Sequence, residues 1–223
     1  MQTFETTAPI SAHLDIPAGH VRFIAADRTD TTVEVLPADP ARSRDVKTAE
    51  QTTVSYTDGV LRIETPTAKN RLLGPGGGSL DVTVRLPAGS RIEARAASAE
   101  LRGVGRLGDV TYDAAQGAVK LDETARATLT LQAGDITVGR LGGPARITTR
   151  KGDLLITEAV HGTVTLRTEA GDITLGATRG ASASLDAGTA HGRIHNALKN
   201  TDGTPDLTVH ATTGHGDITA RSL

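Results

Sequence analysis

A short phrase recurs seven times between Arg91 and the C-terminus, and it constrains the fold more than any other feature of the chain. Most copies contain Gly, an acidic residue and a branched apolar residue. The steps between the apolar residues, which we call anchors, are 18, 17, 18, 19, 21 and 24 residues. A period near 20 is typical of stacked repeats. The copies are Ala99-Glu100-Leu101, Gly117-Ala118-Val119, Gly134-Asp135-Ile136, Gly152-Asp153-Leu154, Gly171-Asp172-Ile173, Gly192-Arg193-Ile194 and Gly216-Asp217-Ile218.

Alignment on the anchors reveals further columns of apolar residues. Positions nine and seven residues before the anchor share one parity, and the anchor and the position two residues after it share another. Alternation with period two predicts a β-strand with one buried face in each group. The column nine residues before the anchor contains Ile92, Val110, Ala127, Ala145, Val164, Leu185 and Val209.

A glycine two residues before the anchor separates the two strands in six of the seven copies. Such a parity break with Gly indicates a corner at which the backbone excludes a Cβ. An antiparallel meander would also explain the alternation, but recurrence of identical columns favours parallel coils. We therefore predict an all-β fold, a short-rung parallel β-solenoid of about seven rungs. The predicted corner glycines are Gly117, Gly134, Gly152, Gly171, Gly192 and Gly216.

Residues 1–90 lack this period but retain β signals. We predict that they form an irregular N-terminal β cap, sandwich-like and continuous with the solenoid of residues 91–223, because the first rung needs its edge covered. Asp58-Gly59 predicts a hairpin turn. Pro40–Glu50 is the one plausible helical turn, and Ala68–Ser79 and the turn-rich insertion Asn196–Pro205 are expected to be loops. The expected strands are Phe4–Thr7, Ala12–Ile16, Val21–Ala25, Thr32–Leu36, Thr52–Tyr56, Val60–Thr65 and Ser79–Leu86.

Composition excludes several classes of function. Aromatic residues make up only 2% of the chain and Trp is absent, which argues against a carbohydrate cleft built on aromatic platforms. The net charge of −2 argues against nucleic-acid binding. No stretch is apolar enough to insert into a membrane, and Met1–Glu5 lacks the features of an export signal. The sequence thus leads us to expect a cytoplasmic location.

Three aspartates, Asp135, Asp153 and Asp172, occupy the same repeat position and would form a row if the rungs stack in register. A row of carboxylates about 5 Å apart could bind a cation, as calcium does in repeat-in-toxin solenoids. The alternative, which we favour, is that each Asp accepts hydrogen bonds from backbone amides of the corner. In that interpretation Arg193 lies between Asp172 and Asp217 and relieves repulsion within the row.

Two histidines, His191 and His215, share the position three residues before the anchor and should stack on neighbouring rungs. No third ligand recurs at a fixed spacing, so we expect neither a metal site nor any other cofactor there. The acidic column with Arg193 also has a loose likeness to the sites of solenoid polysaccharide lyases. No nucleophile–base order stands out, so we expect no catalytic residues and no enzymatic activity.

The Gly-Asp-Ile/Leu corners, the Leu86–Ser90 entry into the rungs and the Thr57–Ile63 hairpin resemble a bacterial family of "putative adhesins", a domain of unknown function built from β-strand repeats. The resemblance extends from about Ala12 to Ala220. It implies a β-repeat fold and, in some relatives, attachment at the cell surface. It implies no catalytic residues.

Besides a polysaccharide-acting enzyme, two non-enzymatic functions remain open. The first is a non-enzymatic scaffold that binds a protein or envelope partner through its flat rung faces or the Asp135–Asp172 edge. The second is a self-assembling structural protein comparable to the cytoskeletal bactofilins. For that alternative we expect self-association through the C-terminal edge, because no cap follows the last repeat.

Overall fold

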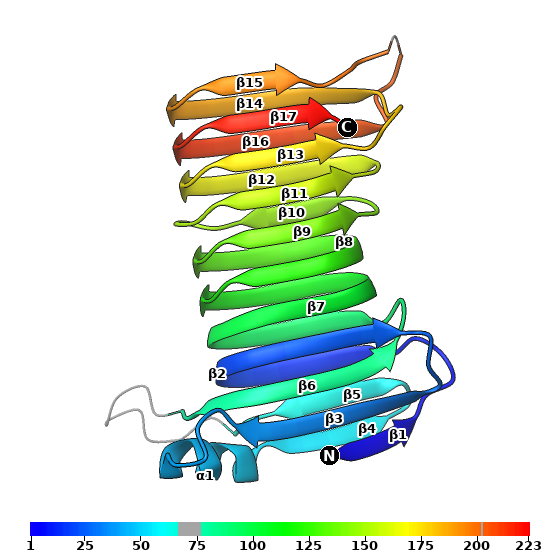
Figure 1. The fold of residues 1–223 in the computed structure, drawn as a ribbon, viewed down its shortest axis with the longest axis vertical. Helices are drawn as coiled ribbons and strands as arrows, with labels where there is room; N and C mark the ends of the chain where they lie inside the picture. The colour runs from blue at the N-terminus through cyan, green and yellow to red at the C-terminus, as the bar shows by residue number, and fades with distance from the viewer. Residues whose placement is uncertain (67–76, 202) are drawn as a thin grey trace.

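The computed structural model describes residues 1–66, 77–201 and 203–223 and shows a tall stack of β-strand coils (Figure 1). Most of the expected loop Ala68–Ser79, and residue 202 of the expected insertion, lie outside the described residues. The strands pair mainly in parallel from one coil to the next. The predicted β-solenoid is confirmed.

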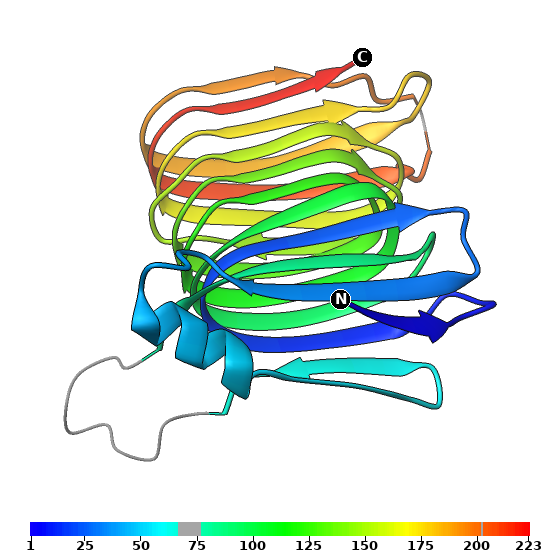
Figure 2. The ribbon, with the colours of Figure 1, turned by 60° about the horizontal axis from the view of Figure 1, so that its bottom comes forward.

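Each coil places one strand in each of two walls, and the core lies between the walls (Figure 2). Three long strands bend from one wall into the other: β2 (Ser11–Ala26), β7 (Arg91–Gln116) and β8 (Val119–Ala133). The rear wall in Figure 1 continues with β10 (Ala145–Thr148), β12 (Gly162–Ala170), β14 (Ala183–His191) and β16 (Leu207–His215). The front wall continues with β9 (Ile136–Leu141), β11 (Leu154–Ala159), β13 (Ile173–Ala177), β15 (Ile194–Ala197) and β17 (Ile218–Ser222).

The repeat columns become vertical rows of side chains in the core. The anchor Val119 lies opposite Leu101 below it and Ile136 above it, and Leu154 lies opposite Ile136 and Ile173. These anchors are at most 2% exposed. Because each buried residue lies on a like residue, one alternating pattern fixes both the strand register and the core.

Antiparallel strands and a helix close the N-terminal end of the stack. The hairpin of β4 (Thr53–Thr57) and β5 (Val60–Glu64) turns at Asp58 and Gly59, which have φ angles of 50° and 77°. β1 (Gln2–Glu5) pairs with β3 (Asp30–Pro37), and β3 pairs with β6 (Ser79–Pro87). Helix α1 (Ser43–Gln51) falls where the helical turn was expected and contacts β3 and β6.

Parallel stacking begins earlier in the chain than the repeat suggested. β2 lies between β7 on one side and β5 and β6 on the other, parallel to all three. Gly19 and Val21 of β2 face Ala99 and Leu101, so β2 is a further rung, and β5 with β6 forms another beneath it. The boundary between an N-terminal cap and the solenoid at residue 90 stays a prediction. Both of these rungs are formed by residues before that boundary.

The last two rungs are stacked out of chain order. β16 pairs with β12 below and β14 above, and β17 pairs with β13 below and β15 above (Figure 1). The C-terminal rung is therefore inserted between two rungs that precede it in sequence. The expected open edge at the C-terminus is wrong, because the end of the stack is formed by β14 and β15.

Candidate functional site

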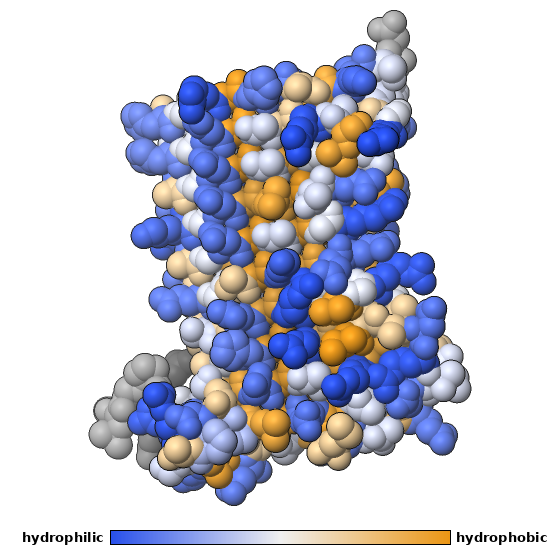
Figure 3. All heavy atoms as spheres, in the orientation of Figure 1, coloured by the Kyte–Doolittle hydropathy of each residue, from blue (hydrophilic) through white to orange (hydrophobic). Residues whose placement is uncertain are grey.

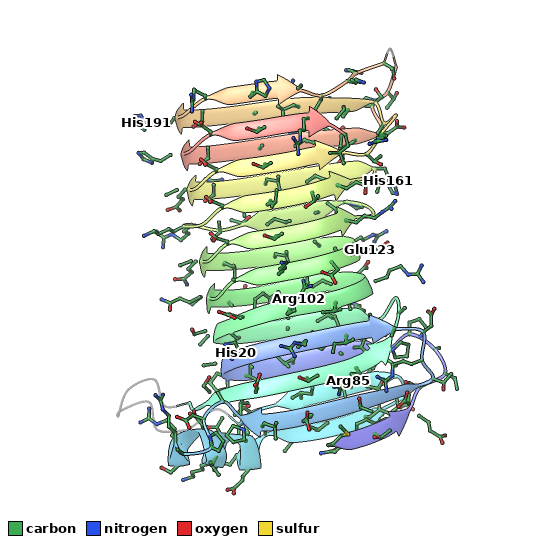
Figure 4. The ribbon with its side chains drawn as sticks, in the orientation of Figure 1. His20, Arg85, Arg102, Glu123, His161 and His191 are labelled. Carbon is green, nitrogen blue, oxygen red and sulfur yellow. The ribbon has the colours of Figure 1, made fainter. Side chains whose placement is uncertain are left out.

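The Gly–Asp corners form a continuous ridge along one side of the stack, the side on which Figure 4 labels His191. At Gly152 the backbone has a φ of 144°, a region that residues with a Cβ rarely adopt, and a Cβ would collide with the carbonyl oxygen of Gly134. Gly192 lacks the positive φ, but a Cβ there would collide with the Gly216 carbonyl oxygen. The other corner glycines with positive φ are Gly117, Gly134, Gly171 and Gly216.

The acidic column is a ladder of hydrogen bonds between side chains and backbone amides. The Asp153 amide donates to Asp135 Oδ1 at 2.9 Å, and the Asp172 amide donates to Asp153 Oδ1 at 2.8 Å. The Asp217 amide continues the ladder to Asp172 Oδ1 at 2.7 Å. These are the corner bonds that the alternative to a cation site predicts.

Arg193 terminates this ladder instead of interrupting it. Its amide donates to Asp217 Oδ1 at 2.8 Å, and its guanidinium donates to Asp217 Oδ2 at 2.7 Å through Nη2. The side-chain hydrogen bond from Arg193 lowers the pKa of Asp217 and, reciprocally, raises the pKa of Arg193. The expected position of Arg193 between Asp172 and Asp217 is wrong, because its rung lies above that of Asp217.

His191 and His215 stack as their shared repeat position predicts. Their ring centroids lie 4.7 Å apart at an interplanar angle of 23°, and both residues are exposed. Across residues 1–66, 77–201 and 203–223, no group of three or more His, Cys, Asp or Glu residues is placed to hold a metal ion.

A ladder of threonines beneath the corners was missed from the sequence. Thr168 Oγ1 donates to the Gly152 carbonyl oxygen at 3.1 Å, and Thr213 Oγ1 donates to that of Gly171 at 2.9 Å. Thr189 makes the same bond to Gly216 at 3.0 Å. The signal was present, since these threonines all lie five residues before an anchor. At the corners of Gly152, Gly171 and Gly216, an Asp carboxylate thus accepts from a backbone amide and a Thr hydroxyl donates to the glycine carbonyl.

A polar groove of about 420 Å³ crosses the outer side of the rear wall near the N-terminal end. Charges of both signs line it: His13 Nδ1 lies 3.3 Å from Glu93 Oε2, and Arg62, Arg95 and Asp113 lie alongside. Tyr112 is buried beneath and donates to the Ala99 carbonyl oxygen at 2.7 Å, and burial raises the pKa of its hydroxyl. The groove therefore offers mixed charge, while its tyrosine is held as a structural donor.

The front wall carries a different surface, which we call the front strip. It consists of Thr137, Leu155, Thr174 and Thr219, which face one another on successive rungs. Leu155 is 38% exposed. Figure 3 shows a pale and orange stripe along the middle of this face between blue margins. The front strip is flat because its residues project from paired strands, and none of its members is charged.

The described residues contain no helix of the length and apolar character needed to cross a bilayer. A family model described as Toastrack DUF4097 matches residues 88–221. No curated protein matches the chain.

Several solved structures match nearly the whole chain at low sequence identity. A putative adhesin from Bacteroides fragilis is 12% identical with a TM-score of 0.47, covering 98% of this chain and 95% of that one. A putative adhesin from Parabacteroides distasonis is 13% identical with a TM-score of 0.43, covering 100% and 95%. A putative cell adhesion protein from Clostridium sporogenes is 10% identical with a TM-score of 0.42, covering 100% and 98%. Similarity at this level transfers neither a ligand nor an activity.

Proposed function

This chain belongs to the Toastrack DUF4097 family, whose model matches more than half of its residues, and we propose that it is a non-catalytic β-solenoid scaffold that acts as an adhesin-like binding protein. Its partner is a protein or another component of the cell envelope. The front strip is the contact surface. The observation that supports this proposal is the exposure of Leu155 within a flat, uncharged row of threonines.

Two properties of the front strip favour binding over chemistry. Its side chains project from strands paired on both sides, so little conformational entropy is lost when a partner contacts them. It is also bounded by charge, because the same column continues downward as Lys120 and Arg102. An apolar centre with a charged margin is typical of protein interfaces.

The test compares binding of labelled protein to cell-envelope fragments and to purified peptidoglycan by co-sedimentation. We expect Leu155→Asp to weaken binding at least about tenfold, because it places a charge in the apolar centre. The matched control is Thr128→Asp, an exposed position on the rear wall, which should bind like the wild type. Equal binding by Leu155→Asp and wild type, or no binding to either material, would overturn the proposal.

The alternative function, cleavage of a polysaccharide, would depend on the aspartates of the acidic ladder. Its Oδ1 atoms accept backbone amides, which supports a structural role for Asp153 and Asp172. Assays of polysaccharide cleavage with Asp153→Asn and Asp172→Asn test this point. A cleavage activity that the wild type has and both variants lose would contradict a non-catalytic function.

The cytoplasmic location expected from the sequence also stays a proposal. Fractionation of cells that express the native gene, followed by immunodetection, tests it. Recovery with the cell surface would reject a cytoplasmic location.

A further inference from the structure

The top of the stack ends in strands that have a strand neighbour on one side only. β14 pairs only with β16, and β15 only with β17, among the strands of the described residues. At its start the Ala183 amide donates to the Lys199 carbonyl oxygen at 3.0 Å, whereas residues 184–191 of β14 and the four residues of β15 have no strand neighbour on that side among the described residues. Natural edge strands are commonly blocked by Pro, Lys or a bulge. β14 contains neither Pro nor Lys, and its pairing with β16 shows no register shift.

The hydrophobic core is also open at this end. Ile194 continues the anchor column above Ile218. It is 46% exposed, whereas Ile218 and Ile173 are each 1% exposed. If further strands paired with β14 and β15, they would bury the exposed side chain of Ile194. They would also form hydrogen bonds with the backbone groups of these two edge strands.

The opposite end is built differently. There β4 and β1 are also edge strands, with β5 and β3 as their only strand neighbours among the described residues, but Phe4 and Tyr56 pack on the core and on each other, with ring centroids 5.4 Å apart. Helix α1 flanks this end (Figure 2). A head-to-tail filament would join two ends of different construction, whereas a top-to-top contact joins two identical strand edges.

We propose that two copies of this chain associate top to top through β14 and β15 in a two-fold symmetric dimer. Two-fold symmetry makes the facing strands antiparallel and the contact self-complementary. With β14 centred on Ala187, Asp186 of one copy faces Gly188 of the other, so the two Asp186 carboxylates avoid direct opposition. Residues 198–201 and 203–206, between β15 and β16, lie on the side opposite His191, so their two copies would lie at opposite corners (Figures 1 and 4).

Sedimentation equilibrium over a range of concentrations tests this assembly. We expect the wild type to approach twice the chain mass of 23.0 kDa and not to exceed it. Ile194→Asp should shift it to the monomer, because it places a charge in the open core. Leu155→Asp is the matched control, similarly exposed but on an interior rung, and should remain dimeric. Thermal unfolding of each variant verifies that it is folded.

Gly188 tests the proposed register, because a Cβ there would meet no other atom within 4 Å. Gly188→Glu would oppose Asp186 of the second copy and should weaken the dimer about tenfold or more. Gly188→Lys would attract Asp186 and should leave the dimer intact or tighten it. A wild-type monomer at every concentration, growth beyond two copies, equal effects of Ile194→Asp and Leu155→Asp, or equal effects of the two Gly188 variants would each overturn the proposal. Because Leu155→Asp disrupts the front strip alone, this proposal and the proposed function can fail separately.

Discussion

Glycine, aspartate and threonine have different roles at the corners of Gly152, Gly171 and Gly216. Glycine permits the backbone of one rung to lie directly on the carbonyl of the rung below, as Gly152 does on Gly134. Aspartate accepts the next amide, and threonine donates to the glycine carbonyl. Because a buried or crowded backbone group without a partner destabilises the fold, the three columns are best understood as one hydrogen-bonded unit.

Gly152→Val should destabilise the protein far more than Thr157→Val. Valine at position 152 would have a left-handed φ, costing about 1–2 kcal/mol, and its Cβ would overlap the Gly134 carbonyl in addition. We expect a total loss above about 3 kcal/mol, whereas exposed Thr157 should change stability by less than about 0.5 kcal/mol. Thermal unfolding measures both, and equal melting temperatures would contradict the corner assignment.

The Arg193–Asp217 pair should make stability depend on acid. The Arg193 hydrogen bond lowers the pKa of Asp217, so the pair stabilises the folded state above the ordinary Asp pKa of about 3.9. That contribution is lost as pH falls through the lowered pKa of Asp217. The difference in melting temperature between wild type and Asp217→Asn should therefore be larger at pH 7 than at pH 2.5. A difference that grows on acidification would contradict this sign.

At the scale of the strands, the order of the last two rungs follows from which one tolerates exposure. β16 and β17 place Val209 and Ala220 in core columns, and both are buried. In the corresponding columns, β14 and β15 place Leu185 and Asn196. An amide such as Asn196 would lack partners inside the core, whereas at the top of the stack it is exposed. Terminal rungs of solenoids are commonly atypical for this reason.

Two isoleucines of the anchor column test this order directly. Ile218→Ala should cost about 2–5 kcal/mol, because the side chain is buried on an interior rung. Ile194→Ala should cost less than about 2 kcal/mol, because nearly half of that side chain is already in water. Denaturant unfolding at low protein concentration measures both. Stacking in chain order would reverse the ranking.

At the scale of the whole molecule, the N-terminal region is part of the stack as well as its cover. β2 pairs with β7 along most of its length, and its Ala12, Leu14 and Val21 continue the core columns. The two halves of the chain therefore share one continuous core. The family model begins at residue 88, so its match does not include β2.

A fragment of residues 91–223 should consequently aggregate. Loss of β2 would uncover the β7 edge together with Ile92 and Leu101, both buried in the whole chain. A chain that lacks only residues 1–5 is the control, because β3 is the one strand that pairs with β1 in the described part of the chain, so β1 should be dispensable for solubility. Size-exclusion chromatography with light scattering distinguishes the two. A monodisperse fragment that melts like the whole chain would contradict this prediction.

Local pattern was sufficient to predict the strands, their register and the corner column. Alternation with period two decides which side chains enter the core, and a one-residue slip would expose them, so Leu101, Val119 and Ile136 could be aligned from sequence. The same signal was present at Gly19-His20-Val21, but this single copy lies far in sequence from the next one and so does not show a period. The Thr168 and Thr213 bonds were missed because threonine alone does not reveal which carbonyl lies beneath it.

The sequence by itself determined the layered fold, since like side chains at a fixed spacing can bury themselves only by stacking. It did not determine the vertical order of the layers. Every rung presents nearly the same columns, so pairing energy is similar for many orders, and the choice depends on contacts distant in sequence. Only the tertiary structure decided that β14 and β15 form the exposed end, because only there do Ile194 and Asn196 meet water instead of another rung.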